Sequence, residues 1–402
     1  MHIAIITDHG HLTGGIAKVA IDSAIGLAKR GHHVIFFAAA GPIDQRLTEA
    51  GVETICLEQP DLAQSPIRGL TQGIWNGTAR VALQSLMKRL PVGGSAIHVH
   101  GWAKALSPSI SSVVANSGHA AFYTLHDYFL FCPNGGFYNY QKGHICKLEP
   151  MSAACMAEHC DSRSYFFKLW RIARQAVADK VAHMRRNIPN LILISQLQQE
   201  IVGPFLDESV KIHRISNPIS ITDQGPKNAL EGDFVFVGRV SREKGVATFL
   251  EAARLATARA VVVGDGPDLP ALKQAYPDAI FLGWLPPTQV EEQLRRARAL
   301  VFPSVWYEGQ PLTVYEALAL GTPVIVSDAC AGREAVTDGI TGLWFKASDP
   351  EDLRRAILTL QDDTLARRMS QAAHAHYWSN ALTPDRHLDQ LEAAYRAALP
   401  AV

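Results

Sequence analysis

The chain has 402 residues, which at about 150 residues per domain predicts two large domains or three small ones. Hydrophobic residues make up 48% of the chain and charged residues 19%, a balance that suits large buried cores and excludes a disordered or fibrous protein. The 38 Lys and Arg residues balance 38 Asp and Glu residues, so there is no basic field to hold a polyanion, which argues against nucleic acid as a partner.

Apolar runs in this sequence stay well short of the roughly 18 residues that a membrane span requires. Residues 1–7 already have the pattern of a buried strand, without the basic, apolar and small-residue segments of a secretory leader. These features predict a cytoplasmic protein, either free or at the inner face of the membrane.

The first half of the chain alternates short apolar runs with helical stretches. A strand pattern, a glycine loop, a helix at 16–29 and a second strand at 33–40 form an opening βαβ unit. Such alternation is typical of a parallel sheet covered on both faces. Further strands are predicted at 53–58, 95–100, 119–126 and 191–195.

A stretch rich in Pro, Gly, Asn and Asp at 217–232 is predicted to be a linker. The alternation then restarts, which predicts an α/β chain with two Rossmann-like domains, 1–216 and 233–375, whose parallel sheets face each other across a cleft. Residues 376–402 are predicted to form a helical tail that can pack back on the N-terminal domain. Strands of the second domain are predicted at 234–239, 260–266, 279–284, 299–304 and 322–328.

The segment 303–328 predicts a phosphate site. Pro311 stands where a helix would begin, at the carboxyl ends of the strands. Unpaired N–H groups near 310–313 and the positive end of the helix dipole favour a diphosphate there. Glu308 precedes this helix and Glu316 lies within it, and both carboxylates suit hydroxyl-rich ligands as hydrogen-bond acceptors.

Two cations, Arg239 and Lys244, stand on either side of a short loop after the first strand of the second domain. Fixed cations can stabilise the negative charge that grows on a departing nucleoside diphosphate without a metal ion. The sequence also contains no D-x-D pair, the metal-chelating signature of the other main transferase fold. Catalysis is therefore expected to need no metal and no other cofactor.

The second half resembles the donor domain of glycosyltransferase family 4, the retaining sugar transferases of the GT-B fold. The resemblance covers most of the chain from 234 to about 345. It rests on glycine-containing motifs at 238–245, 264–267 and 283, and on Glu308 and Glu316 at the spacing E-x7-E, all in the order that the family has them.

The resemblance implies roles for single residues. Arg239 and Lys244 would contact the diphosphate, Glu308 would touch hydroxyls of the donor sugar, and Glu316 would bind the ribose. Gln310 departs from the family, which commonly has an aromatic residue there. The expected donor-binding positions are Gly14, Gly15, Gly238, Gly266, Trp284, Gly309, Gln310, Pro311, Leu312, Thr313 and Glu316.

Histidines end two strands of the first domain, His98 and His100 on one and His126 on another. Strand ends of this kind face the ligand cleft, although a structural role with backbone partners is the alternative for each. His126 matches the family's cleft histidine near the donor sugar, so it joins Glu308, Arg239 and Lys244 as an expected catalytic residue. No carboxylate of this half stands out as a general base, although Asp127 is a neighbour of His126 in the sequence. This fits the retaining mechanism that the resemblance implies, in which the leaving phosphate takes the acceptor proton.

Four cysteines crowd an insertion near 130–162: Cys132, Cys146, Cys155 and Cys160. A structural zinc ion takes Cys and His ligands readily, but the spacing contains no C-x-x-C. Reduced structural thiols, or a strap that forms disulfides only after oxidation, are the alternatives.

The segment 163–186 carries seven cations and a single acid, Asp179, with aromatic residues at its start. A basic helix of this kind could lie on an anionic membrane and present the enzyme to a lipid-linked acceptor. The alternative is an ordinary amphipathic helix with its apolar stripe packed inward.

The function predicted from these features is the retaining transfer of a sugar from a nucleoside-diphosphate sugar to a saccharide or lipid-linked saccharide. Synthesis of a cell-surface polysaccharide or glycoconjugate is the expected context. Two alternatives stay open: a GT-B epimerase that acts on the nucleotide sugar without an acceptor, and a GT-B scaffold protein without catalytic activity.

Overall fold

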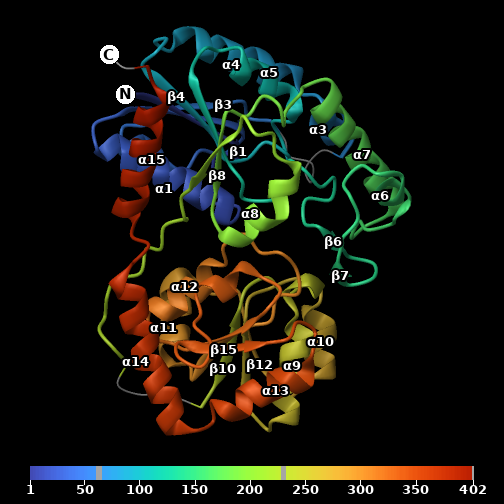
Figure 1. Cartoon of the computed structure of the whole chain (residues 1–402), viewed down its shortest axis with the longest axis vertical. Helices are drawn as coiled ribbons and strands as arrows, with labels where there is room; N and C mark the ends of the chain where they lie inside the picture. The colour runs from blue at the N-terminus through green and yellow to red at the C-terminus, as the bar shows by residue number, and fades with distance from the viewer. Residues whose placement is uncertain (60–65, 228–231, 401–402) are drawn as a thin grey trace. The chain divides into compact units, whose positions relative to one another are not determined.

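The computed structural model describes residues 1–59, 66–227 and 232–400 (Figure 1). The chain forms two compact units. Unit 1 contains Met1–Phe137, Lys147–Pro218 and the chain from Thr383 onward, and unit 2 contains Tyr138–Cys146 and Ile219–Leu382. The sequence had placed 138–146 in the N-terminal domain, and the structure assigns it to unit 2. Residues 228–231 of the predicted linker lie outside the described residues.

Unit 1 is built on a seven-stranded sheet in which each strand is parallel to its neighbours. Its strands are β1 (His2–His9), β2 (His33–Ala40), β3 (Glu53–Cys56), β4 (Ser95–Val99), β5 (Ala120–Thr124), β8 (Asn190–Leu193) and β9 (Lys211–Arg214). The spatial order is β3-β2-β1-β4-β5-β8-β9. The chain order therefore reverses between β1 and β4, and ligands of open α/β sheets bind at the carboxyl ends of strands beside such a reversal.

The helices of unit 1 are α1 (Gly15–Lys29), α2 (Gln45–Glu49), α3 (Pro66–Ile74), α4 (Gly77–Arg89), α5 (Ser111–Ala115), α6 (Ala153–Ala157), α7 (Tyr165–Lys180), α8 (Gln196–Val202) and α15 (Pro384–Ala398). Short 3₁₀ turns lie at Pro108–Ile110 (η1) and Gly203–Phe205 (η2). The central strand β1 is buried on both faces, as a parallel sheet covered by helices requires. Across the part of the chain that the structure describes, no helix is both long and apolar enough to cross a bilayer.

Unit 2 repeats this architecture with six strands, again parallel to their neighbours. They are β10 (Phe234–Val237), β11 (Ala260–Val263), β12 (Ile280–Gly283), β13 (Ala299–Phe302), β14 (Val324–Ser327) and β15 (Gly342–Phe345). Their order is β12-β11-β10-β13-β14-β15, so the reversal lies between β10 and β13. The prediction of two Rossmann-like parallel sheets is confirmed.

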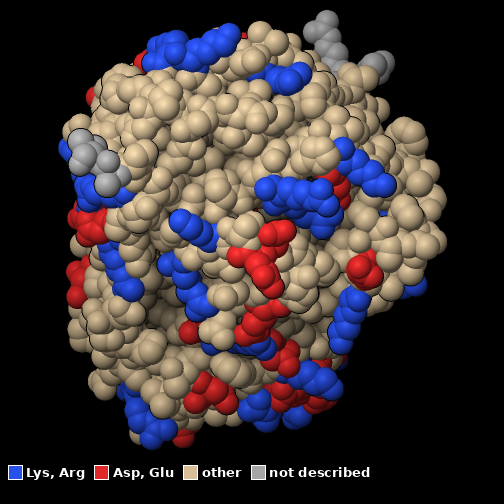
Figure 2. Space-filling model, turned by 45° about the horizontal axis from the view of Figure 1, so that its top comes forward, with Lys and Arg blue, Asp and Glu red and all other residues tan. Residues whose placement is uncertain are grey.

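The helices of unit 2 are α9 (Val246–Leu255), α10 (Leu269–Ala275), α11 (Pro287–Arg296), α12 (Leu312–Ala319), α13 (Pro350–Thr359) and α14 (Asp363–Ser379). A small antiparallel hairpin, β6 (Tyr138–Asn139) and β7 (His144–Ile145), and the 3₁₀ turns η3 (Arg242–Lys244) and η4 (Ala331–Glu334) complete it. On the face shown in Figure 2, several positive side chains lie beside negative ones.

The C-terminal helix α15 packs on unit 1 through buried polar side chains as well as apolar ones. The His387 ring contacts the Ser23 hydroxyl at 3.1 Å and the Ser216 carbonyl oxygen at 2.8 Å. The Tyr395 hydroxyl lies 2.6 Å from Nδ1 of His98 on β4. Burial lowers the pKa of His387 to about 4 and holds that of His98 well below its ordinary value. Both rings are therefore neutral in the folded protein at neutral pH.

These neutral histidines predict that acid weakens the fold. As the pH decreases below 6.5, His387 becomes protonated in the unfolded chain, whereas in the folded chain it stays neutral down to about pH 4. The free energy of unfolding should therefore decrease as the pH is lowered from 6.5 to 4, by up to about 1.4 kcal/mol per pH unit for this one group. Urea unfolding of the wild type and of His387→Asn at several pH values measures this. The variant should show the shallower pH dependence, and equal slopes would contradict the assignment.

Candidate active site

The loops that follow β10 and β13 touch each other at the strand reversal of unit 2. The amide of Val305 donates to the carbonyl oxygen of Glu243 over 2.9 Å. Gly245 has a φ of +69°, and a Cβ at this position would overlap the carbonyl oxygen of Pro303. Only glycine accepts both constraints, so this residue lets the two loops meet backbone to backbone.

This contact brings Lys244 to Glu308. The Lys244 ammonium donates to Oε1 of Glu308 at 2.6 Å. The Ser304 hydroxyl and the Trp306 indole N–H donate to the same oxygen at 2.8 and 2.7 Å. Among the described residues no hydrogen bond reaches Oε2, so one oxygen of this carboxylate is held and the other is available to a ligand.

The surroundings keep Glu308 ionised. Burial raises the pKa of its carboxyl group, but the charge of Lys244 and the hydrogen bonds from Lys244, Trp306 and Ser304 outweigh this and leave the pKa below its ordinary value. The site thus holds an ionised carboxylate in an ion pair with Lys244, and both side chains are only partly exposed to solvent.

Helix α12 begins directly after this loop. Pro311 is its N-cap and has no capping side chain, and no acidic residue occupies the first turn. The first N–H groups of the helix and its positive end are therefore not compensated by a carboxylate of their own helix. Gln310 is buried beside this turn and Glu316 is partly buried further along α12. The sequence began this helix one residue early, at Pro311.

The other residues of unit 2 that the sequence predicts to bind a nucleotide-sugar donor follow the carboxyl ends of strands. Gly238 follows β10 with a φ of +155°, and Arg239 beside it is exposed. Gly266 follows β11 and is so close to the carbonyl oxygen of Val240 that no side chain fits. Trp284 follows the edge strand β12 and is 74% exposed, and no contact joins it to the Lys244 pair.

In unit 1, Gly14 and Gly15 lie where β1 leads into α1. Gly14 is the N-cap with a φ of 155°, and α1, like α12, has neither a capping side chain nor an acidic first turn. Asp8 near the end of β1 accepts three backbone N–H groups, from Lys104, Ala105 and Leu106, at 3.1, 2.8 and 2.9 Å. This carboxylate fixes the loop after β4, a feature that the sequence alone did not indicate.

The three strand-end histidines of unit 1 differ in their surroundings. Both ring nitrogens of His98 are bonded, to the hydroxyls of Tyr395 and Thr124, which makes it a structural residue. His126 shares a hydrogen bond of 3.0 Å with His100 through its Nε2 and is partly exposed. Burial lowers the pKa of His126 to about 3, so the ring is neutral and can offer Nδ1 to a ligand.

Asp127 follows His126 and is a buried carboxylate whose pKa rises. Burial, with the negative charge of Asp8 as a smaller cause, raises the pKa of Asp127 to about 6, while its hydrogen bond from the Phe129 amide acts in the opposite direction. A carboxyl group that titrates near neutral pH at a strand end can donate or accept a proton. The sequence places Asp127 next to His126 but does not predict the raised pKa of its carboxyl group.

Two cysteines of the cysteine-rich insertion contact the side chain of Lys168. The buried Lys168 ammonium donates to the sulfurs of Cys155 at 3.6 Å and Cys160 at 3.2 Å. The six cysteines are free thiols, and Cys146 belongs to unit 2 while the others of the insertion belong to unit 1. Nowhere in the described ranges do three His, Cys, Asp or Glu side chains form a group that could hold a metal ion. The zinc interpretation is therefore not supported.

Only some of the cations in the basic segment 163–186 are exposed to solvent. Lys168 and Arg174 of α7 are buried, and Arg174 donates to the carbonyl oxygen of Ala103 at 2.8 Å. Arg171 forms an ion pair of 2.7 Å with the buried Asp161. These cations stabilise the interior of unit 1, so the exposed charge is lower than the sequence count suggests.

Residues 231–363 match the model of the family described as "Glycosyl transferases group 1". This segment belongs to the glycosyl transferases group 1. The match spans β10 to α13 and includes Arg239, Lys244, Glu308 and Glu316. The resemblance to family 4 of the glycosyltransferases is confirmed.

Curated relatives agree with this assignment. A D-inositol 3-phosphate glycosyltransferase of Geodermatophilus obscurus is 36% identical over 184 residues, 41% of this chain and 40% of the relative. A UDP-Gal:alpha-D-GlcNAc-diphosphoundecaprenol alpha-1,3-galactosyltransferase of Escherichia coli is 29% identical over 152 residues, 34% of this chain and 38% of the relative. The chain thus aligns with less than half the length of each of these two relatives.

Solved structures extend the likeness to the whole chain. Anabaena HepE in complex with UDP superimposes with a TM-score of 0.65 over 99% of this chain and 100% of its own, at 17% identity. A glycosyltransferase from Rickettsia africae gives a TM-score of 0.68 over 100% of this chain and 99% of its own, at 15% identity. With two Rossmann-like sheets and this likeness over its whole length, the chain has the GT-B fold.

The close approach at Gly245 predicts a large effect of a single methyl group. Gly245→Ala adds a Cβ against backbone at a positive φ and should cost at least about 2 kcal/mol of unfolding free energy. It should also weaken nucleotide binding, because it displaces Lys244. Gly225→Ala is the matched control, since Gly225 has a φ of +73° and open space around it, and it should cost about 1 kcal/mol. Equal effects of the two substitutions on unfolding would contradict the account.

Lys244→Ala should discriminate between a nucleoside diphosphate and a nucleoside. A charge-assisted hydrogen bond contributes about 1.5–3 kcal/mol, so the affinity for a nucleoside diphosphate should fall about tenfold or more. The affinity for the nucleoside alone should change little. Titration calorimetry of both ligands measures this, with Lys273→Ala, an exposed cation of α10, as the control. An equal loss for both ligands would exclude a phosphate contact.

Proposed function

We propose that this protein is a retaining GT-B glycosyltransferase that moves a sugar from a nucleoside-diphosphate sugar to a saccharide or lipid-linked saccharide. The observation that carries the proposal is the Lys244–Glu308 pair, held at the strand reversal of unit 2 beside the start of α12. A cation, an oriented carboxylate and an uncompensated helix N-terminus at one place suit a ligand that joins a diphosphate to a sugar.

The donor would be held by its two chemically different parts. Lys244, Arg239 and the first amides of α12 would bind the diphosphate. The free Oε2 of Glu308 would accept hydrogen bonds from sugar hydroxyls, since Oε1 is already occupied by three donors. Glu316 would accept from the ribose. The Lys244–Glu308 pair is already oriented by its hydrogen bonds before the ligand arrives, which lowers the cost of reorganisation.

In the reaction, the bond between the anomeric carbon and the donor phosphate oxygen breaks as the acceptor oxygen bonds to the same carbon from the same face. The acceptor hydroxyl gives its proton to the leaving phosphate, so no separate base is required. Lys244 and Arg239 would stabilise the negative charge on the departing diphosphate without a metal ion. The neutral His126 would accept or donate a hydrogen bond at the donor sugar.

Two named relatives support the classes of substrate. The Escherichia coli relative is named for a UDP-Gal donor and a diphosphoundecaprenol-linked acceptor, and HepE was solved with UDP. A nucleoside diphosphate as leaving group, and a saccharide acceptor that can be lipid-linked, are the corresponding proposals for this chain. Synthesis of a cell-surface glycan is the context that these classes favour.

Glu308→Gln tests the proposal in a transfer assay. It keeps the size of the side chain but removes the charge that pairs with Lys244, so transfer should fall about 100-fold or more. Its melting temperature should change by only a few degrees. Glu292→Gln, an exposed position on α11, should keep full activity. Full transfer by Glu308→Gln would refute the role of this carboxylate.

The product distinguishes the proposed reaction from its alternatives. NMR of the product of a transfer reaction should show the anomeric configuration of the donor, and an inverted product would refute the retaining mechanism. Incubation with the nucleotide sugar but no acceptor should leave its stereochemistry unchanged. An epimerised nucleotide sugar would instead identify an epimerase.

A further inference from the structure

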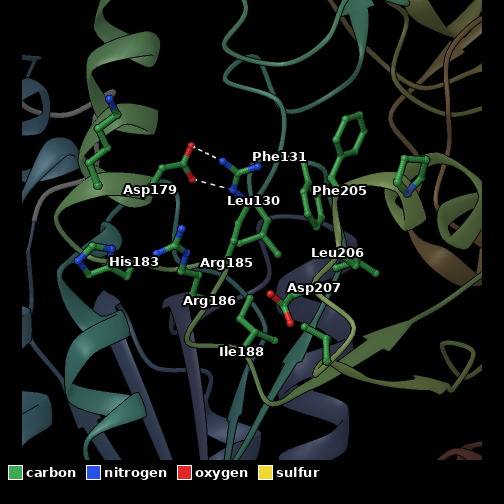
Figure 3. Close-up of a pocket in the computed structure, with 13 residues that line it drawn as sticks. Leu130, Phe131, Asp179, His183, Arg185, Arg186, Ile188, Phe205, Leu206 and Asp207 are labelled. Atoms are coloured by element: carbon green, nitrogen blue, oxygen red, sulfur yellow. Dashed lines mark hydrogen bonds and ion pairs between the residues drawn. The ribbon is translucent and has the colours of Figure 1, made fainter.

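Unit 1 contains a cavity of about 570 Å³ that the proposed function does not use (Figure 3). It is lined by the C-terminal end of α7, the turn at 183–188, η2 and Val210. The turn precedes β8 and Val210 precedes β9, so this part of the lining lies at the amino ends of the strands. The predicted ligand site, with His126, is at the carboxyl ends. Leu130, which follows β5, lines both the cavity and the pocket beside His126, and the cationic part of the cavity lies away from that pocket.

One side of the cavity is apolar. Its lining includes Leu130, Phe131, Ile188, Phe205 and Leu206. The rings of Phe131 and Phe205 lie 6.1 Å apart, and Figure 3 shows both side chains on the same side of the cavity as Leu206. A wall of this kind accepts an alkyl or isoprenoid chain and makes no polar demand on it.

The other side is basic. His183, Arg185 and Arg186 lie together on it in Figure 3, and Lys180 completes the lining cations. Arg185 is occupied by Asp179 through two hydrogen bonds of 2.9 and 2.8 Å. Within the described residues, Lys180 and Arg186 form no hydrogen bond or ion pair through their side chains. Two cations therefore remain available to an anion.

The second acid of the lining, Asp207, forms no ion pair with these cations within the described residues, and the charge of Arg186 is a smaller cause of its lowered pKa than the hydrogen bonds from Ser209. Its carboxylate accepts the amide and the hydroxyl of Ser209 at 3.0 and 2.7 Å, which closes a local turn. Both acids of the cavity are thus engaged within the protein, one by an arginine and one by a turn.

The outer face of α7 leads to this cavity. Phe166 and Leu169 are 62% and 49% exposed, and with Ala173 and Lys180 they recur at spacings that place them on one side of the helix. An exposed apolar stripe that ends at a cation suits the surface of an anionic membrane. A lipid anchored there would have its phosphate near Lys180.

We propose that this cavity binds a lipid phosphate, with the chain on the apolar wall and the phosphate on Lys180 and Arg186. The lipid would be a component of the membrane on which the enzyme works or the carrier of its acceptor. The second use rests on the proposed function, whereas the binding itself does not. The inference assigns a ligand class to unit 1 from charge and apolar surface together.

Titration calorimetry of the full chain with farnesyl phosphate below its micelle concentration tests the proposal. Inorganic phosphate and farnesol are the two partial ligands. Farnesyl phosphate should bind at least tenfold more tightly than either one, because only it satisfies both walls. Equal binding of inorganic phosphate would show an anion site without lipid specificity, equal binding of farnesol would show an apolar site without a phosphate contact, and no binding would refute the proposal outright.

Variants locate the ligand. The double substitution Lys180→Ala and Arg186→Ala should weaken farnesyl phosphate at least tenfold and leave farnesol unchanged. The matched control is Lys29→Ala with Lys88→Ala, which removes two exposed cations from the last turns of α1 and α4. Equal weakening by both pairs would mean that only net charge matters, which would overturn the assigned site.

The outcome for the cavity is separable from that of the proposed function. Binding of farnesyl phosphate needs no donor, and the Lys180 and Arg186 variants should bind nucleoside diphosphate as the wild type does. A protein that binds nucleotide but no farnesyl phosphate would refute only the lipid proposal. A protein that binds farnesyl phosphate but transfers no sugar would refute only the glycosyltransferase proposal.

Discussion

The Lys244 ammonium and the Glu308 carboxylate, 2.6 Å apart, form the interaction on which the account of unit 2 depends. Burial alone would raise the pKa of the Glu308 carboxyl group, and the charge of Lys244 with the hydrogen bonds from Lys244, Trp306 and Ser304 outweighs this effect. The same three donors on one carboxylate oxygen fix the orientation of Glu308. The geometry of the proposed sugar-diphosphate site follows from this pair before any ligand is present.

The pair in turn depends on the fold of the sheet. The order of the strands reverses between β10 and β13, so the loops after these two strands are neighbours although they are far apart in the sequence. Gly245 allows them to touch, and the hydrogen bond from Val305 to Glu243 holds them in register. A parallel sheet, a topological reversal and one glycine thus convert sequence motifs into a single charged site.

Local patterns predict much of this protein correctly. The strands β1, β2, β10 and β13 could be predicted because buried parallel strands are short, continuous apolar runs. The helix α12 could be predicted because Pro311 marks its start. The strand β15 (Gly342–Phe345) was missed although it is apolar, because it is only four residues long and begins with glycine. The strand β9 was missed because its Lys211–Arg214 sequence is charged and largely exposed at a sheet edge. Edge strands of this kind carry no apolar signal.

Tertiary contacts account for the rest of what was missed. Ser304 and Trp306 hold Glu308, but their side chains converge on it only once the loop has folded. The hairpin at 138–146 joins unit 2 because Arg242 donates to the carbonyl oxygens of Tyr140 and Gln141, both at 3.1 Å. A sequence pattern does not reveal such a contact. Similarly, charge counting at 163–186 could not show which cations are buried.

The central claim is that unit 2 binds a nucleoside diphosphate, and thermal shift measurements test it most directly. The full chain would be heated with UDP, GDP, ADP, CDP or NAD, each in the presence of a chelator. A ligand of the native state raises the melting temperature, and the stabilisation grows with the logarithm of the ligand concentration divided by Kd. The account predicts a clear shift with at least one nucleoside diphosphate and none with NAD. A shift with NAD alone, or with none of the five, would contradict it.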